Sequence, residues 1–160
     1  MNYFRKIENE TTKKGFQIIS KDFERPWGGF LLIDESQAQD FVNSFFDGID
    51  TETLKTGVRL SPKILIVNPK SKLSWQYHKR RAEIWNVYKG KIGVSKSMDD
   101  KEKPMTVLNK NDQIKINKGE RHRLIGLEDY ALISEIWQHT DTDHPSDESD
   151  IVRISDDYGR

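Results

Sequence analysis

Short runs of apolar residues, separated by turns, fill the chain from residue 63 onward. The turns are rich in glycine, asparagine, aspartate and lysine. Short runs bounded by such residues predict β-strands, and a succession of them predicts an all-β sandwich or barrel. The predicted strands cover residues 64–67, 73–77, 83–88, 91–96, 105–108, 113–116, 121–125 and 131–138, with a further short segment at 151–154.

The N-terminal part of the chain is less regular. Residues 1–15 are charged and end at Gly15, so we interpret them as an arm that either frays or pairs with another subunit. Residues 16–20 predict a strand, and the apolar segment 30–33 predicts a short buried strand. Residues 21–29, between these two segments, are rich in turn-forming residues and predict a loop.

In residues 34–60 the apolar residues follow a helical spacing, unlike the strand-like runs in the rest of the chain. They recur at i, i+3, i+4, i+7 and i+8, which predicts an amphipathic helix at residues 36–46. Ser36 is the predicted N-cap and Gly48 the predicted end, with a further helical turn at 52–55. We favour packing of this helix against its own barrel, with a lid or a subunit contact as alternatives. The apolar positions are Ala38, Phe41, Val42, Phe45 and Phe46.

Composition narrows the class of protein. The 160 residues fit a single domain, and the 26 basic and 26 acidic residues cancel, so charge gives no argument for a nucleic acid or an acidic membrane as partner. Without cysteine, neither disulfides nor thiolate metal ligands are possible. No apolar run resembles a signal peptide or reaches the roughly 20 residues that span a bilayer. We therefore expect a soluble cytoplasmic protein.

Four residues on neighbouring predicted strands form a candidate metal site. Gln76 and His78 are two residues apart, so a strand places both side chains on one face. Glu83 begins the next predicted strand, and His122 follows a turn at Gly119 on a later strand. An amide oxygen, a carboxylate and two imidazoles suit a divalent ion such as Zn, Mn, Fe, Co or Ni, with one coordination position left for water or substrate.

Residues 70–90 and 111–126 resemble the two motifs of the cupin superfamily. The first motif has glutamine, Gln76, where most cupins have histidine. In this respect the chain resembles the sugar-phosphate isomerase branch of the superfamily. An example of that branch is the isomerase half of bifunctional mannose-6-phosphate isomerase/mannose-1-phosphate guanylyltransferase. The matching residues of that branch are Gln76, His78, Arg81, Ala82, Glu83 and Trp85, with the opening phrase Arg25-Pro26-Trp27-Gly28 and the closing residues 150–153, Asp156 and Tyr158-Gly159-Arg160.

The resemblance also has departures. Lys70, Asn117 and Gly126 stand at turn positions where the general pattern favours other residues. Lys79-Arg80 replaces a histidine-rich pair, which leaves the sugar open. The block 34–60 looks like an insertion relative to the bifunctional enzymes, and no Gly-rich nucleotide-binding loop is present, so guanylyltransferase activity is not expected.

The resemblance implies a cupin double-stranded β-helix, or jelly-roll barrel, over residues 1–160. It implies one divalent metal, with zinc favoured, and an aldose–ketose isomerase that acts on a sugar phosphate such as mannose 6-phosphate through an enediol(ate). Arg81 matches an arginine that the family uses in catalysis, the alternative being a solvated arginine on a turn. Lys79, Arg80 and Arg123 are candidate substrate-binding cations, although strand alternation turns Arg123 away from His122 unless the strand is bulged.

An isomerase also needs a base that moves a proton between adjacent carbons. Glu135 is our candidate, because it lies within an apolar predicted strand where a carboxylate must be paired or functional. The alternative is a structural glutamate bonded to a buried arginine. Of the tryptophans, Trp27, Trp75, Trp85 and Trp137, each is more typical of a core than of a sugar-stacking platform.

Other functions stay open at this stage. The chain could be a non-catalytic cupin that binds a metal and a sugar phosphate, an isomerase for another sugar such as a heptose phosphate, or a metal-dependent dioxygenase. We expect a homodimer, because barrel strands leave open edges that need cover. His139 and His144, with Asp141 and Asp143, form a loose polar cluster that we interpret as surface crowding.

Overall fold

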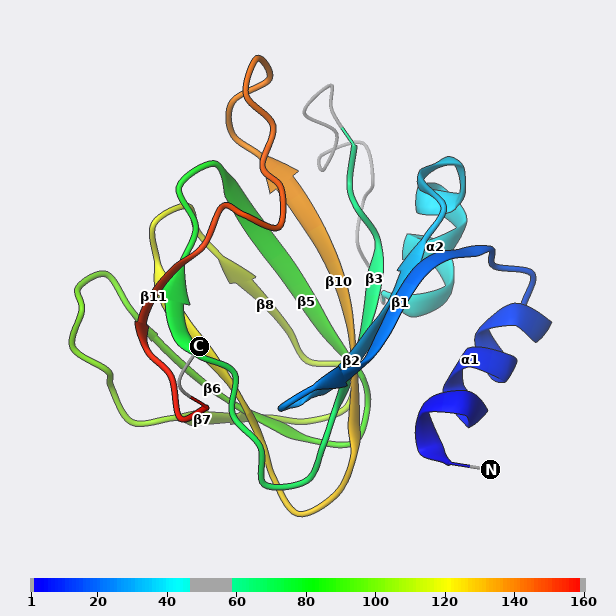
Figure 1. Cartoon of the computed structure of the whole chain (residues 1–160), viewed down its shortest axis with the longest axis horizontal. Coiled ribbons are helices and arrows are strands. Elements are labelled where there is room, and N and C mark those ends of the chain that lie inside the picture. Colours follow the sequence, from blue (N-terminus) through cyan, green and yellow to red (C-terminus); the bar gives the residue numbers. More distant parts are fainter. Residues whose placement is uncertain (1, 47–58, 159–160) are drawn as a thin grey trace.

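Two antiparallel β-sheets face each other and carry two helices on one side (Figure 1). The computed structural model describes residues 2–46 and 59–158. In the first sheet the strand order is β1 (Ile18–Arg25), β2 (Gly28–Ile33), β3 (Lys63–Val67), β10 (Ala131–His139), β5 (Arg81–Lys89) and β8 (Gln113–Ile116). In the second sheet the order is β11 (Val152–Ser155), β4 (Trp75–Tyr77), β9 (Arg121–Gly126), β6 (Ile92–Ser97) and β7 (Thr106–Leu108).

The all-β prediction is confirmed. Each of the eight runs predicted between residues 64 and 138 is a strand, and the segment predicted at 151–154 is β11. Strand β3 shows why its apolar run is continuous, because both of its faces are buried. Leu65 and Val67 point between the two sheets, while Ile64 and Ile66 point to the helices on the outer face of the first sheet.

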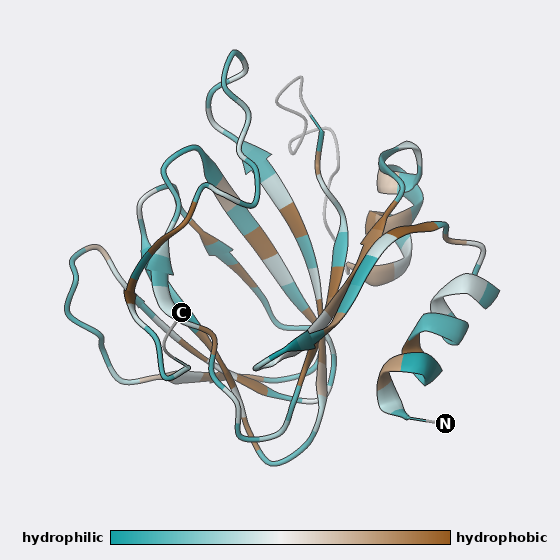
Figure 2. Cartoon of the chain, in the orientation of Figure 1, coloured by the Kyte–Doolittle hydropathy of each residue, from teal (hydrophilic) through white to brown (hydrophobic). Residues whose placement is uncertain are grey.

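The apolar residues divide into two cores, and Figure 2 shows apolar stretches on the strands and on the helix faces. The inner core lies between the sheets and contains Trp85, Val87, Ile92, Leu124 and Ile133. The outer core joins the first sheet to helices α1 (Tyr3–Lys13) and α2 (Ala38–Phe45). Because the inner core fills only part of the space between the sheets, the polar side chains of the same strands are left to form a site.

Residues 1–15, which we expected to form an arm, contain helix α1 instead. The Asn2 side chain accepts a hydrogen bond from Arg5 N at 2.9 Å and caps the helix, and Ile7 is buried in the outer core. The loop predicted at 21–29 is also wrong, because β1 continues to Arg25 and pairs with β2 in a hairpin. Gly28 has φ +142°, and a Cβ there would lie 1.9 Å from the Ile66 carbonyl oxygen, so the tight approach of β2 to β3 requires glycine.

The helix predicted at 36–46 is present as a short 3₁₀ turn (Glu35–Gln37) followed by α2. The capping residue is Asp34 rather than Ser36, since its carboxylate accepts from Ser36 N at 2.9 Å. The apolar side chains of α2 are buried in the outer core of the same chain, which confirms the packing that we favoured over a lid or a subunit contact. Gly48 and the helical turn expected at 52–55 lie outside the described residues.

A membrane span was not expected from the sequence. In the described ranges 2–46 and 59–158, no helix combines the length and the apolar character needed to cross a bilayer.

Candidate metal centre and its cavity

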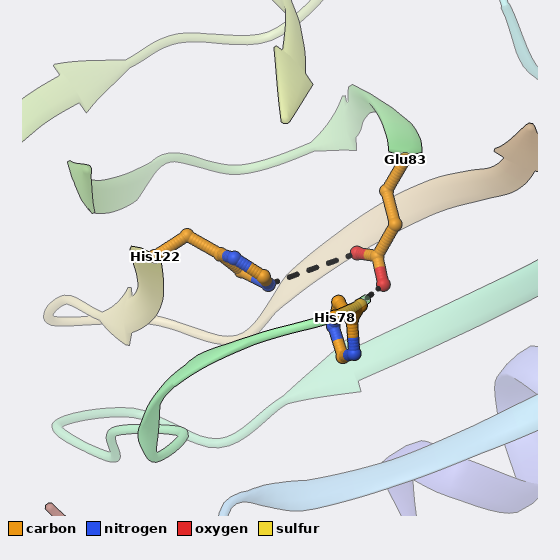
Figure 3. A group of neighbouring side chains, drawn as sticks. All are labelled: His78, Glu83 and His122. Carbon is orange, nitrogen blue, oxygen red and sulfur yellow. Dashed lines mark ion pairs between the residues drawn. The ribbon is translucent and has the colours of Figure 1, made fainter. Parts of the chain in front are cut away.

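Three buried side chains from three segments converge between the sheets (Figure 3). His78 directly follows β4, Glu83 lies on β5 and His122 lies on β9. One nitrogen or oxygen atom of each lies within 4.8 Å of the others. His78 Nε2 is 3.0 Å from Glu83 Oε1, and His122 Nε2 is 4.0 Å from Glu83 Oε2. The sequence prediction that these three residues meet is therefore confirmed.

Both histidines are oriented by main-chain carbonyls. His78 Nδ1 lies 2.7 Å from the Asp150 carbonyl oxygen, and His122 Nδ1 lies 3.0 Å from that of Glu120. A carbonyl oxygen only accepts, so each Nδ1 carries a proton and each ring turns its Nε2 toward Glu83. His122 Nε2 is buried without a hydrogen-bond partner among the described residues. Two imidazole nitrogens and a carboxylate arranged in this way fit a divalent metal ion.

The predicted fourth ligand, Gln76, is adjacent to this cluster. It is paired in register with His122 across β4 and β9, and it lines the same cavity as His78 and Glu83. Its Oε1 accepts a hydrogen bond from the Ser74 hydroxyl. Coordination by Gln76 stays a prediction, with Gln76 lining the cavity that His78 and Glu83 also line.

Arg81 is buried, not solvated on a turn, and it holds the cluster together. Its guanidinium lies 3.7 Å from the centroid of the Trp137 ring. Its N–H groups donate to Glu83 Oε1 (3.0 Å), Ser146 Oγ (2.9 Å), the Asp147 carbonyl (3.0 Å) and His78 Nε2 (3.3 Å). The contact with His78 is the longest of the four, so it is the one that a metal ion at Nε2 would replace.

The surroundings of the cluster shift the pKa values of Glu83 and His122. Burial would raise the pKa of Glu83, but the neighbouring His78 and Arg81 outweigh it and hold that pKa well below the usual value. Burial lowers the pKa of His122 to about 4, against the opposing effect of the Glu83 carboxylate. At neutral pH Glu83 is thus ionised and His122 neutral, which are the protonation states that metal ligands require.

Glu135, the predicted base, faces the same cavity from β10. The indole Nε1 of Trp85 donates both to Glu135 Oε1 at 3.1 Å and to Glu83 Oε2 at 3.0 Å, so the two carboxylates share one donor. Within residues 2–46 and 59–158, no arginine hydrogen-bonds Glu135, so the structural alternative does not describe how this carboxyl is held. Burial and the charge of Glu83 raise the pKa of Glu135 well above its usual value.

Three predicted substrate-binding cations lie elsewhere. The backbone N–H groups of Lys79 and Arg80 donate to the Asp150 carboxylate at 2.9 and 3.0 Å, which fixes their turn outside the cavity lining. Arg123 points away from His122, as strand alternation requires, and its guanidinium is 3.2 Å from Glu102 Oε1 and 3.1 Å from Ser155 Oγ.

The cavity is instead lined by cations that we did not assign from the sequence: Arg25, Lys63 and Arg153, in addition to Arg81. Arg25 and Arg153 belong to the first and last sequence segments that match the family. The sequence therefore singled out these two residues, but it did not indicate that they line the cavity. No sequence pattern indicated that Lys63 is buried in the cavity, because a lysine at the start of a strand is usually exposed.

The four tryptophans and the two remaining histidines differ in where they lie. Trp27, Trp85 and Trp137 line the cavity, whereas Trp75 donates its Nε1 to the Asp100 carbonyl at 2.9 Å, outside the cavity lining. The interpretation of surface crowding is wrong for His139, which is the buried last residue of β10 and accepts from Ser146 N at 2.9 Å. His144 is an exposed side chain 3.2 Å from Asp141, in line with the surface interpretation of that pair.

Fold and site together define a cupin with a candidate metal centre. Two crystal structures of CapF share the fold: one with the inhibitor 3-isopropenyl-tropolone (TM-score 0.56, 13% identity, covering 88% of this chain and 34% of that chain), and one of the capsular polysaccharide assembling protein CapF from Staphylococcus aureus (TM-score 0.54, 14% identity, covering 86% and 34%). The chain therefore spans about a third of the CapF chain. No curated protein sequence matches it.

The family model described as mannose-6-phosphate isomerase C-terminal matches residues 45–156. The match extends over more than half of the chain, and the chain belongs to this family. It includes His78, Glu83, His122 and Glu135, so every buried group of the candidate centre lies in the family domain.

The raised pKa of Glu135 has a measurable effect on stability. A carboxyl with a raised folded-state pKa stabilises the fold fully below its unfolded pKa of about 4.3, and this contribution is lost as the pH rises toward the folded value. We expect metal-free Glu135→Gln to gain stability relative to the metal-free wild type above about pH 4.3, by up to about 1.4 kcal/mol per pH unit. Urea unfolding of both proteins across this range measures the difference; a constant difference would contradict the raised pKa.

Proposed function

We propose that the chain is a metal-dependent aldose–ketose isomerase that acts on a sugar phosphate of the mannose 6-phosphate class. The observation that carries the proposal is a second buried carboxylate, Glu135, next to the His78–Glu83–His122 cluster in a cavity lined by cations. The family match supports the substrate class. Zinc as the metal in the cell and a homodimeric state stay predictions.

His78, Glu83 and His122 would hold the metal, with Gln76 as the fourth ligand. A divalent ion at this position supplies Lewis acidity toward a sugar carbonyl oxygen. The chain prepares the site by presenting two imidazole Nε2 atoms and an ionised carboxylate between the sheets. A single carboxylate among neutral ligands leaves net positive charge at the centre, which favours a substrate oxygen that gains negative charge.

We assign the proton transfer to Glu135. An aldose–ketose isomerisation takes a proton from one carbon and returns it to the adjacent carbon, so it needs a base with a pKa near the working pH. Burial and Glu83 shift the pKa of Glu135 in that direction. The shared Trp85 donor keeps one Glu135 oxygen beside Glu83, and so beside the place where a substrate carbonyl would bind.

Arg81 acts as a positioning residue for the centre. It fixes Glu83 through Nε, and its Nη1 binds the loop that contains Ser146 and Asp147. Stacking on Trp137 holds the guanidinium plane in place. These contacts support a role in ordering the ligand set and the loop next to it.

A coupled isomerase assay with mannose 6-phosphate tests the proposal. We expect turnover by protein loaded in turn with Zn²⁺, Mn²⁺, Fe²⁺, Co²⁺ or Ni²⁺, and loss of turnover after chelation. A metal-loaded protein that converts none of mannose, glucose and heptose phosphates would contradict the isomerase.

A cupin that binds a metal and a sugar phosphate without turnover is the second candidate. It is favoured by one observation, which is that Arg81, the arginine that the resemblance associates with catalysis, donates to Glu83, His78 and the neighbouring loop and is thus used structurally. Under this alternative, titration would show sugar phosphate binding while the assay stays at background. Oxygen consumption by the iron-loaded protein would instead indicate the dioxygenase alternative.

A further inference from the structure

Lys63 is a buried cation at the edge of the cavity. It is the first residue of β3, and only 5% of its surface is exposed. Its ammonium lies 4.2 Å from the centroid of the Trp137 ring and 5.3 Å from that of Phe30, and it forms an ion pair with Glu148. A buried ammonium is unfavourable without negative charge nearby, and Glu148 supplies such a charge, so an anion that replaces Glu148 suits the same place.

The two members of the Lys63 ion pair differ in exposure. Glu148 lies in the loop between β10 and β11, and its side chain is 65% exposed although that of Lys63 is 6% exposed. An exposed carboxylate gives up little when it leaves the pair, because the surrounding water screens the attraction and hydrates the freed carboxylate. The pair is therefore one in which the anion can be exchanged while the cation stays fixed.

The other buried cation of the cavity is not available in this way. Arg81 already donates through Nε, Nη1 and Nη2, to a carboxylate, a hydroxyl, a carbonyl and an imidazole. Arg25, at the rim, lies 3.0 Å from Asp22 within its own hairpin. Among the described cations that line the cavity, Lys63 is thus the buried one whose anion comes from an exposed loop residue.

The strand register of the first sheet gives the approximate distance between the backbones of Lys63 and Glu83, one of the candidate metal ligands. Lys63 pairs with Glu135 on β10, Glu135 pairs with Trp85 on β5, and Glu83 lies two residues along β5. Two strand spacings of about 4.8 Å and a two-residue step of about 7 Å place the Lys63 and Glu83 backbones roughly 12 Å apart. With both side chains directed into the cavity, the gap suits a sugar whose phosphate and carbonyl lie at opposite ends.

We propose that Lys63 binds the phosphate group of the substrate, and that Glu148 is a resident counter-ion that this phosphate displaces. The sugar part of this inference rests on the proposed isomerase, whereas the binding of a phosphate by Lys63 does not. Arg25 and Arg153, which line the same cavity, add positive charge along the approach.

The test is a titration of the full chain with inorganic phosphate, with and without Zn²⁺ because phosphate also binds metals. Glu148→Gln removes the competing charge and is expected to tighten phosphate binding about 3- to 5-fold, the range of a partly exposed ion pair. Lys63→Met is expected to weaken binding at least about 10-fold. In the Lys63→Met background, Glu148→Gln is expected to have no further effect.

Glu128→Gln is the matched control, since Glu128 is an exposed carboxylate paired with Lys70 outside this cavity. Unchanged or weaker phosphate binding by Glu148→Gln would overturn the proposal, and this variant decides alone if Lys63→Met does not fold. Unchanged binding by a folded Lys63→Met would overturn it as well. Phosphate binding that follows these expectations without isomerase turnover would retain the subsite and reject only the isomerase.

Discussion

Replacing His122 with alanine is expected to lower the affinity for a divalent metal ion by at least about 100-fold and to reduce isomerase turnover to background. Loss of an outer partner of a metal ligand already lowers affinity about 10- to 100-fold, and loss of the ligand itself has a larger effect. The imidazole removed here is buried, and its Nε2 has no hydrogen-bond partner among the described residues. Titration with Zn²⁺ and elemental analysis of the purified protein measure the change.

The control for this variant is His144→Ala. His144 is exposed and contacts Asp141, so its removal is expected to leave both metal content and turnover unchanged. Full metal occupancy of His122→Ala would show that the buried cluster is not the metal site. The fold of the metal-free variant should survive, because the mutation removes a buried polar group that lacks a partner at Nε2.

Replacing Glu135 with glutamine is expected to lower kcat by about 10²- to 10⁴-fold while metal content stays that of the wild type. This is the range by which a positioned general base contributes to proton transfer. Glutamine keeps an oxygen that accepts from Trp85 Nε1 but cannot take up a proton. Steady-state kinetics on the metal-loaded variant, together with elemental analysis, separate the loss of the base from the loss of the metal.

A purely structural Glu135 would give another result. The variant would then change in stability, with kcat within a few-fold of the wild type. Glu128→Gln serves again as the control, since it removes an exposed carboxylate without touching the cavity. Exchange of the substrate proton with deuterated solvent gives an independent measurement, because exchange requires the base even when product release limits turnover.

Much of this fold was predictable from the sequence. The strands from β3 to β10 are short apolar runs between turn residues, and their existence follows from that pattern. The N-terminal part was not predictable in the same way. Helix α1 has few apolar residues, and its burial of Ile7 depends on an outer core that forms only when α2 and the first sheet are in place. The strand predicted at 16–20 marks the start of β1, but the turn-forming residues at 21–29 suggested a loop and hid its continuation to Arg25.

The site was predictable where spacing determines geometry. His78, Glu83 and His122 follow from two motifs and the alternation of side chains along strands. The cations of the cavity were not predictable, since their positions depend on long-range pairing. Lys63 reaches the cavity because β3 lies beside β10, whereas Arg123 is directed to Glu102 and β11 by its own strand. No local pattern distinguishes these two environments.

The orientation of the two histidines has a consequence for mutational surveys of this protein. Their Nδ1 atoms are held by the carbonyls of Asp150 and Glu120, which belong to the main chain. Replacing one side chain at a time leaves both carbonyl groups in place. Such a scan would detect the metal ligands but not the main-chain groups that orient them. Changes in the path of the backbone, such as an insertion beside residue 150 or residue 120, would tilt an imidazole with no ligand altered. Insertions and deletions in these two loops should therefore be tolerated less well than substitutions.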